Sequence, residues 1–273
     1  MKSILVYATE DEGQAARVAA ALDLARATGA HLTFLHVTPY SSYVATDPFG
    51  GAYLAVGILQ EIARMTAEAK ARLTERMRGQ DVLWTWVEAD GGAAHAIVEH
   101  SHLADLILLS RPGPEGGAAR DALSLVGDVL VHARAPVLAV PMSARGLDCF
   151  GPIAAAWNGS PEASHALQAA LPLLKLASAV HLITIAEGAP AANRLPATDA
   201  SEYLGYHGLS SELHEVPAGD NGIAATIGAT AAARGAEILI MGGYGHSRFR
   251  EAMLGGATRE LLRSPGGALL LGH

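Results

Sequence analysis

Three glycines near the carboxyl-terminal end of the sequence have the spacing of a phosphate-binding loop. Gly242, Gly245 and Gly255 fit the pattern G-x2-G-x9-G and follow residues 237–241, an apolar stretch that favours a buried strand. Because glycine has no Cβ, the backbone N–H groups of such a loop can approach an anion closely. A helix that begins after the loop would add free N–H donors and a favourable dipole. The chemistry indicated is the binding of a phosphate group.

The same glycines also have a simpler interpretation, because tight turns between a strand and a helix are often rich in glycine. The context favours a site. An earlier strand pattern ends at Asn158, before the turn residues 159–161, and the carboxyl ends of two strands face each other at the switch point of a doubly wound sheet. A mononucleotide would fit between these ends. His246, inside the loop, either contacts the phosphate or is an ordinary residue of a surface turn.

The strands and helices that must position this loop are predicted twice along the chain. Strand patterns at 4–9 and 153–158 each open a half, about 150 residues apart, and each half continues with alternating helices and strands. Residues 38–57, rich in Pro, Gly and Tyr, are an insertion in the first half. The other expected strands are 32–37, 82–88, 105–110, 181–185, 212–216 and 237–241, and the expected helices are 15–25, 59–78, 93–100, 163–174, 200–207 and 223–233.

Strands that alternate with helices in this way indicate right-handed crossovers and a parallel sheet. At 273 residues the chain suits two domains, each large enough to bury a core. Prolines and glycines bracket the short non-periodic stretch 143–151, which places a boundary near residue 146. The predicted fold is α/β and Rossmann-like, with two tandem doubly wound five-stranded parallel-sheet domains at 1–145 and 146–273.

Composition and charge exclude several classes of function. A net charge of -8 without a local basic stripe argues against nucleic-acid binding. No apolar stretch reaches the length of about 20 residues that a membrane helix needs, and the first residues enter a strand pattern without the features of a signal peptide. Cys149 is the only cysteine, which excludes an internal disulfide and a cysteine-based metal cluster. These features predict a cytoplasmic protein that binds neither nucleic acid nor membrane.

Residues 157–163 and 241–248 resemble two motifs of the universal stress protein family, the end of the first strand and the nucleotide loop after the fourth strand. The resemblance extends over nearly the whole chain, is closest in the second half, and implies a tandem two-domain member with the adenine nucleotide alpha hydrolase-like fold. In ATP-binding members an aspartate contacts the adenosine and a Ser or Thr follows the last loop glycine. Those positions here are Asn158, which keeps an acceptor and two donors, and Gly256, which offers no hydroxyl.

The resemblance implies that an adenine nucleotide, ATP or AMP, binds in the second domain only, with Mg²⁺ as a companion of its phosphates. Neither a catalytic residue nor a resident metal ion is expected. The residues expected at the nucleotide are Ala156, Trp157, Asn158, Met241, Gly242, Gly245, His246, Gly255, Gly256, Ala257 and Thr258.

The first half departs from the nucleotide motif. Pro112 and Pro114 occupy the loop position and have no N–H to donate, and Glu115 brings negative charge to the same place. The first strand pattern ends in residues 9–12, whose three carboxylates would repel phosphate unless a metal ion intervened. This copy is therefore expected to be structural.

Residues outside the loop give weaker indications of chemistry. Asp90 and Asp220 each precede a predicted helix, where capping of free N–H groups is a more common role than Mg²⁺ binding. The 12 histidines lack a metal-ligand spacing such as H-E-x-x-H, and His36 and His181 lie in apolar segments where packed histidines are common. The spacing along the chain therefore predicts no metal site.

The leading hypothesis from the sequence is a stress-response regulatory protein whose two halves pair within the chain and whose second half binds the nucleotide as a signal. A nucleotide-free interaction or scaffolding module of the same fold is the alternative, since Asn158 and Gly256 depart from the motif. A third hypothesis is a slow nucleotide hydrolase that uses Asp220 with Mg²⁺. Formation of a homodimer is left open, as is the role of residues 38–57, which either cover the domain or contact a partner.

Overall fold

The first half of the chain follows the predicted alternation of strands and helices. The computed structural model describes residues 1–38, 45–46, 52–53, 56–111, 117–186, 195–243, 256–264 and 266–273. The elements of the first half are β1 (Ser3–Tyr7), α1 (Gln14–Thr28), β2 (His31–Thr38), β3 (Ala45–Thr46), β4 (Ala52–Tyr53), α2 (Val56–Met77), β5 (Trp84–Asp90), α3 (Ala93–His100), β6 (Leu106–Arg111), α4 (Gly117–His132) and β7 (Val137–Pro141).

The second half repeats this alternation without the insertion. In the first half, the insertion contributes β3 and β4, which pair as a short antiparallel ribbon. The elements of the second half are β8 (Ile153–Ala156), α5 (Pro161–Leu174), β9 (Val180–Ala186), α6 (Ala197–Tyr206), β10 (Glu212–Pro217), α7 (Gly222–Ala233), β11 (Ile238–Gly242), α8 (Gly256–Arg263) and β12 (Ala268–Gly272).

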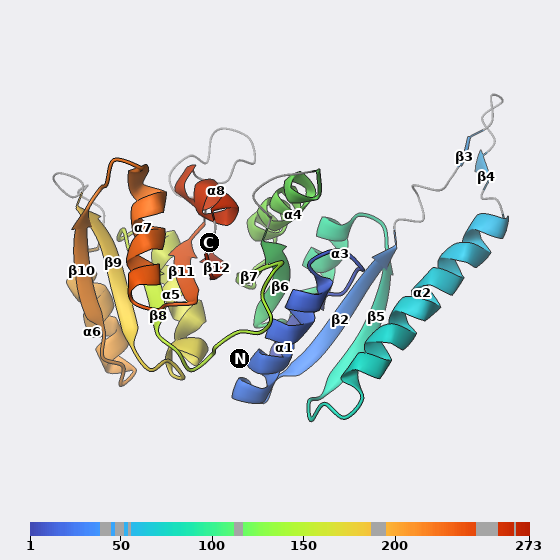
Figure 1. The fold of residues 1–273 in the computed structure, drawn as a ribbon, viewed down its shortest axis with the longest axis horizontal. Helices are drawn as coiled ribbons and strands as arrows, with labels where there is room; N and C mark the ends of the chain where they lie inside the picture. Colours follow the sequence, from blue (N-terminus) through green and yellow to red (C-terminus); the bar gives the residue numbers. More distant parts are fainter. Residues whose placement is uncertain are drawn as a thin grey trace.

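Ten strands form one continuous sheet in the order β10-β9-β8-β11-β12-β7-β6-β1-β2-β5 (Figure 1). Within each half every neighbouring pair is parallel, and the strand order of one half mirrors that of the other. At the centre β12 and β7 run antiparallel, with Leu270 opposite Leu138. The predicted doubly wound α/β fold is confirmed, and the two five-stranded parallel sheets are joined edge to edge.

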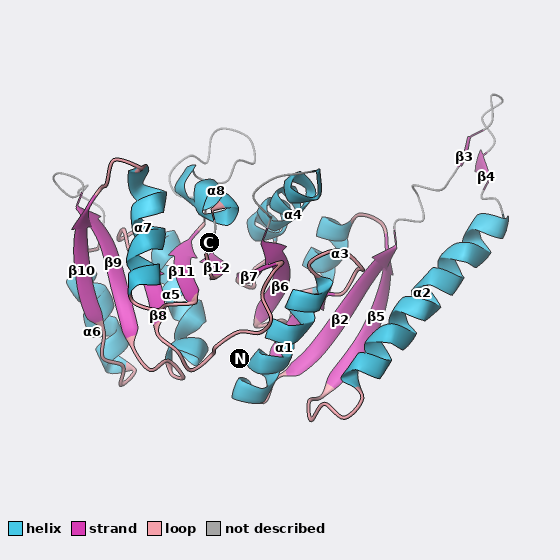
Figure 2. Ribbon diagram, in the orientation of Figure 1, coloured by secondary structure: helices cyan, strands magenta, loops and turns pink. Residues whose placement is uncertain are grey.

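Helices cover both faces of the sheet (Figure 2). One core contains Ile4 and Ile153 and includes residues of α1, α2, α5 and α6. The core on the other face contains Leu5 and Ala154 and includes residues of α3, α4, α7 and α8. Successive side chains of a strand point to opposite faces, so a strand that is buried on both faces must be apolar throughout. This explains the continuous apolar runs of β6, β7 and β12.

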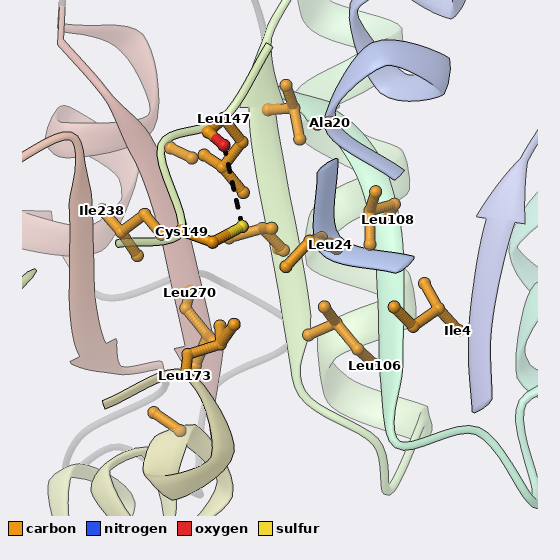
Figure 3. Close-up of a cluster of buried hydrophobic side chains, with 14 of the residues drawn as sticks. Ile4, Ala20, Leu24, Leu106, Leu108, Leu147, Cys149, Leu173, Ile238 and Leu270 are labelled. Carbon is orange, nitrogen blue, oxygen red and sulfur yellow. Dashed lines mark hydrogen bonds between the residues drawn. The ribbon is translucent and has the colours of Figure 1, made fainter. Parts of the chain in front are cut away.

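Residues 142–152, between β7 and β8, pack against the first half. The backbone N–H of Leu147 donates to Asp23 Oδ2 on α1 at 2.9 Å, and a Cβ on Gly146 would lie 2.7 Å from that same oxygen. Leu147 and Cys149 are buried in the core where the two halves meet, with Cys149 Sγ 3.6 Å from the carbonyl oxygen of Leu147 (Figure 3). The domain boundary near residue 146 lies within this segment and stays a prediction.

Candidate functional site

The carboxyl end of β8 is held by bonds from the start of α5. Asn158 Oδ1 accepts the backbone N–H of Ser160 at 3.1 Å, and Ser160 Oγ accepts that of Ala163 at 3.2 Å, which caps the helix. Trp157 is buried, and its Nε1 donates to the carbonyl oxygen of Leu195 at 3.1 Å. Asn158 is exposed, so its amide is presented to solvent at the end of the strand.

The register of β8 and β11 brings two groups of predicted residues together. Ala155 pairs with Ile240, so residues 156–158 lie beside Met241 and Gly242 at the same end of the sheet. The side chains of Trp157 and Met241 belong to the two cores, one on each face. These two residues therefore position the strand ends, while Asn158 is the predicted side chain that is open to a ligand.

Gly242 is required by packing between β11 and α5. A Cβ at this position would lie 2.6 Å from the backbone nitrogen of Ala163 and 2.7 Å from the carbonyl carbon of Glu162. No side chain tolerates backbone atoms at such distances. Close packing of the strand against the helix therefore explains why residue 242 is glycine, whether or not the loop binds a ligand.

The start of α8 is formed by Gly256, which is exposed and has open space where a side chain would stand. Ala257 is partly buried. Thr258 is only 4% exposed, so it packs inward and does not present its hydroxyl at the open end of the helix. The other predicted loop residues, Gly245, His246 and Gly255, lie outside the described residues.

Glu162, in the first turn of α5, has a buried carboxylate oxygen, Oε2, without a hydrogen-bond partner in the described part of the chain. Thr184 Oγ1 on β9 is in the same situation, but so is His36 Nδ1 at the equivalent register position of the first half, so that pair does not distinguish the halves. Buried polar atoms nearly always find a partner. The complement of a carboxylate oxygen is a hydroxyl donor, a water molecule or a cation such as Mg²⁺.

In the first half, a buried arginine spans the corresponding strand ends. Arg17 on α1 is 1% exposed, and the ring of Tyr7 lies 5.3 Å from its guanidinium carbon. A guanidinium can donate five hydrogen bonds in one plane. Those of Arg17 go to the carbonyl oxygens of Tyr7 at 2.6 Å and Thr9 at 2.9 Å, to Asp11 Oδ1 at 2.9 Å, and to Ser110 Oγ.

The second half has alanine in place of this arginine. Ala166 lies as many residues after Ile153 of β8 as Arg17 lies after Ile4 of β1, the strand residues that occupy equivalent register positions. Ala166 packs directly under β12. A Cβ on Gly272 would lie 2.7 Å from Ala166 Cα. At this position α5 therefore contributes only a methyl group, and no cation from the described residues is fixed across the ends of β8 and β11.

Two of the three acidic residues that follow β1, Glu10 and Asp11, are paired with arginines. Arg72 on α2 donates to both carboxylate oxygens of Glu10, at 2.7 Å each, and these bonds lower the pKa of Glu10 below its usual value. Asp11 is bonded to Arg17. The carboxylates were expected to repel phosphate unless a metal ion intervened. Arginines pair with Glu10 and Asp11 instead, so side chains of the first half itself neutralise these acidic residues at the end of β1.

A second buried arginine, Arg111, crosses from the end of β6 to the second half. It is 4% exposed, and burial lowers its pKa to about 10, which leaves it charged at neutral pH. Unpaired carbonyl oxygens at a helix end favour a cation. Arg111 donates to the carbonyl oxygens of Leu261, Leu262, Ser264 and Gly267, at the carboxyl end of α8 and just beyond it. The predicted loop residues Pro112, Pro114 and Glu115 lie outside the described residues.

The model of the Universal stress protein family matches residues 1–141, which is more than half of the chain. The chain belongs to this family. The matched half is the one whose loop departs from the nucleotide motif, so the match rests on the framework of strands and helices rather than on the glycine loop. Among curated proteins, none matches this family member.

Solved structures extend the likeness to both halves of this family member. A universal stress protein from Archaeoglobus fulgidus aligns with a TM-score of 0.73 at 16% identity, over 98% of this chain and 95% of that chain. A structure from Pseudomonas aeruginosa, provisionally named a universal stress protein, aligns with a TM-score of 0.59 at 19% identity, over 99% of this chain and 92% of that chain. At such identities the likeness shows the fold.

Several potentially functional residues, in this region and elsewhere in the fold, were not found from the sequence. Arg17 and Arg111 are charged residues beside apolar runs, which is a signal that they are buried. Their role could not be predicted because a hydrogen-bond partner of each lies far away along the chain. His181, Glu212 and His214 come together on β9 and β10 as potential metal ligands. The available signal was the alternation of Glu212 and His214, which places both side chains on one face of a strand.

The predicted helix caps need correction. The N-cap residue of α7 is Asn221, which makes no side-chain capping bond, so the predicted capping at this helix is wrong. The N-cap residue of α3 is Gly92, and capping by Asp90 stays a prediction. At α7, Thr226 Oγ1 instead accepts from the backbone N–H of Gly219 at 3.0 Å.

Asp220 belongs to no group of three potential metal ligands within the described residues. No helix there is long and apolar enough to cross a membrane.

Proposed function

We propose that this universal stress protein is a cytoplasmic stress-response regulator that binds an adenine nucleotide, ATP or AMP, in its second half. The observation that carries the proposal is the difference between the two switch points. Arg17 uses its donors on the strand ends of the first half, whereas Ala166 stands at that position in the second half. The nucleotide is therefore expected at one site per chain.

Features of the second half supply the contacts that a nucleotide needs. The exposed amide of Asn158 offers donors and an acceptor to the adenosine. The start of α8 at Gly256 has free N–H groups for a phosphate, and Arg111 neutralises the opposite end of the same helix. The buried Oε2 of Glu162 suits Mg²⁺ bound with the phosphates.

A regulatory role is favoured over catalysis. Hydrolysis of a nucleotide would need a general base or a metal ion held by several ligands near the phosphates. Asp220, the residue considered for that role, is exposed in the turn before α7 and has no carboxylate or histidine grouped with it as a metal ligand among the described residues. The nucleotide then acts as a ligand whose binding state is read by a partner.

Position 256 provides a sharp test by calorimetric titration of the full chain with ATP and AMP, with and without Mg²⁺. Gly256→Ser restores a hydroxyl and is expected to tighten binding about tenfold, the worth of one hydrogen bond to a charged group. Gly256→Asp is expected to weaken binding at least about tenfold by repulsion of phosphate, although an acidic residue at a helix start favours the helix itself. No atom of the described residues lies where a Cβ on residue 256 would stand, so both variants are expected to fold.

Asn158 provides a second test, and Thr9, its register equivalent in the first half, provides the matched control. Asn158→Ala is expected to weaken nucleotide binding, and Thr9→Ala is expected to leave it unchanged. The absence of heat and of any thermal shift with millimolar ATP or AMP in both the original chain and Gly256→Ser would overturn the proposal. That result would favour the nucleotide-free interaction module instead.

A further inference from the structure

Three metal-binding side chains meet at the opposite end of the second-half strands from the glycine loop. His181 lies near the amino end of β9, and Glu212 and His214 lie on β10, the edge strand of the sheet. Figure 1 shows α7 beside β9, and the C-cap residue of this helix, Arg234, contacts His214 on β10. The cluster is therefore separate from the proposed nucleotide site, which lies at the carboxyl ends of the strands.

The distances between the ligand atoms match those of a metal site. His181 Nδ1 and His214 Nε2 are 3.1 Å apart, and Glu212 Oε2 is 3.4 Å from the first and 3.6 Å from the second. Zinc binds such atoms at about 2.0–2.1 Å in a tetrahedron, which sets neighbouring ligand atoms about 3.3–3.4 Å apart. The three atoms thus already form one face of a zinc tetrahedron.

The burial of the three side chains fits a site that is fixed on one side and open on the other. The side chains of His181 and His214 are 9% and 16% exposed, whereas that of Glu212 is 68% exposed. Burial, together with the charge of Arg234, lowers the pKa of His214. A neutral imidazole is the form that binds a metal ion. Glu212 closes the tripod from the solvent side, where the ion would enter.

We propose that His181, Glu212 and His214 bind a divalent transition-metal ion, for which zinc is the best match. Two imidazoles and one carboxylate suit zinc and its neighbours in the periodic table, whereas Mg²⁺ and Ca²⁺ prefer oxygen ligands throughout. Three protein ligands leave the fourth position of the tetrahedron to water, as in zinc sites that exchange ligands.

Arg234 competes with the metal ion. Its Nη2 donates to His214 Nδ1 at 2.7 Å, and a neutral imidazole that accepts at Nδ1 carries its single proton on Nε2. Nε2 is the atom that the metal ion needs. Binding therefore requires Arg234 to leave Nδ1 and the ring proton to move from Nε2 to Nδ1. Arg234 keeps a second bond, from Nη1 to the carbonyl oxygen of Thr230 at 3.1 Å.

The first half serves as an internal comparison. The register places Thr33, Thr85 and Val87 at the positions that correspond to His181, Glu212 and His214. This set cannot bind a transition metal as a tripod. The cluster is thus particular to the second half and is not a consequence of the shared framework.

Metal titration of the full chain, free of any affinity tag and stripped of metal with a chelator, tests the proposal. Zinc binding is measured by calorimetry, and Co²⁺ is used as a spectroscopic probe because tetrahedral Co²⁺ absorbs strongly in the visible range. One ion per chain is expected, with a rise in the thermal midpoint. Glu212→Gln and His214→Gln are each expected to weaken zinc binding at least about tenfold, and Arg234→Gln is expected to tighten it.

A surface pair on α3 provides the matched control. His95 Nε2 and Glu99 Oε2 lie 4.0 Å apart without a third potential ligand among the described residues, so His95→Gln is expected to leave zinc binding unchanged. Because Glu212 is exposed, Glu212→Gln is expected to fold normally, which a metal-free thermal midpoint checks. Failure of micromolar zinc to bind, or binding that survives in both Glu212→Gln and His214→Gln, would overturn the proposal.

Discussion

The two halves share a strand order but differ in what stands between the ends of their first and fourth strands. In the first half, Arg17 ties these ends together, and the neighbouring Glu10 is paired with Arg72. In the second half, Ala166 contributes no charge at the corresponding place, and Glu162 keeps a buried oxygen without a partner in the described residues. One side chain on the first helix therefore marks the difference between the two halves, and the proposed nucleotide site lies in the half that lacks it.

The two halves also differ in which residue lets the first helix pack against the end of the fourth strand. The start of the first helix approaches the end of the fourth strand in both. In the first half the small residue is on the helix side, because a Cβ on Gly13 would lie 2.0 Å from Ser110 Oγ. In the second half it is on the strand side, where Gly242 makes room for the backbone around Glu162. Both halves make this contact, but the glycine that permits it precedes the helix in the first half and ends the strand in the second half.

The largest effect is expected from Arg17→Met, which removes the guanidinium that closes the first half. The variant leaves two carbonyl oxygens without their Arg17 donor, and Asp11 keeps only the backbone N–H of Gly13. Because a buried acceptor without a donor costs about 1–3 kcal/mol, the free energy of unfolding is expected to fall by about 2–5 kcal/mol. Urea unfolding measures this loss. Arg78→Met, at an exposed arginine paired with Glu75, serves as the control and is expected to change little. Equal stability of the two variants would break the comparison between the halves.

A smaller effect is expected from Gly13→Ala, because the new methyl group meets Ser110 Oγ. Overpacking of this kind costs about 1–3 kcal/mol. Adding Ser110→Gly to the same chain is expected to recover part of the loss, measured as the coupling in a double-mutant cycle. Additive losses in the double variant would mean that the two positions do not share this contact.

The smallest effect is expected from Glu10→Gln, which breaks an exposed ion pair with Arg72. Hydrogen bonds from Arg72 lower the pKa of Glu10 in the folded state. The stabilisation is therefore fully present above the ordinary pKa of the carboxyl group and is lost as the pH falls through its folded value. Thermal midpoints of the original chain and Glu10→Gln should differ slightly at neutral pH and converge in strong acid. A difference that stays constant with pH would assign the effect to something other than this pair.

The sequence predicts the elements well because their signal is local. Strand and helix periods place α3 at the predicted residues 93–100 and the other elements with predicted bounds within a few residues of their observed ends, whereas the short strands β3 and β4 of the insertion were not predicted. The closing arginines depend on contacts between distant segments, such as Arg17 with Ser110 and Arg111 with the end of α8. The histidine cluster likewise needs the pairing of two strands. Gly242 was assigned to phosphate from its motif, and its packing role became visible once the helix beside it was placed.

The antiparallel pair at the centre of the sheet has a consequence for synthesis of the protein. β7 pairs with β12, which is translated about 130 residues later, an interval of roughly ten seconds at ordinary elongation rates. Throughout that interval the first half has an apolar strand with an unsatisfied edge, a template for pairing with another nascent chain. Ribosomes that follow one another along the same message would hold such edges close together. The hazard of aggregation is therefore highest before translation reaches β12.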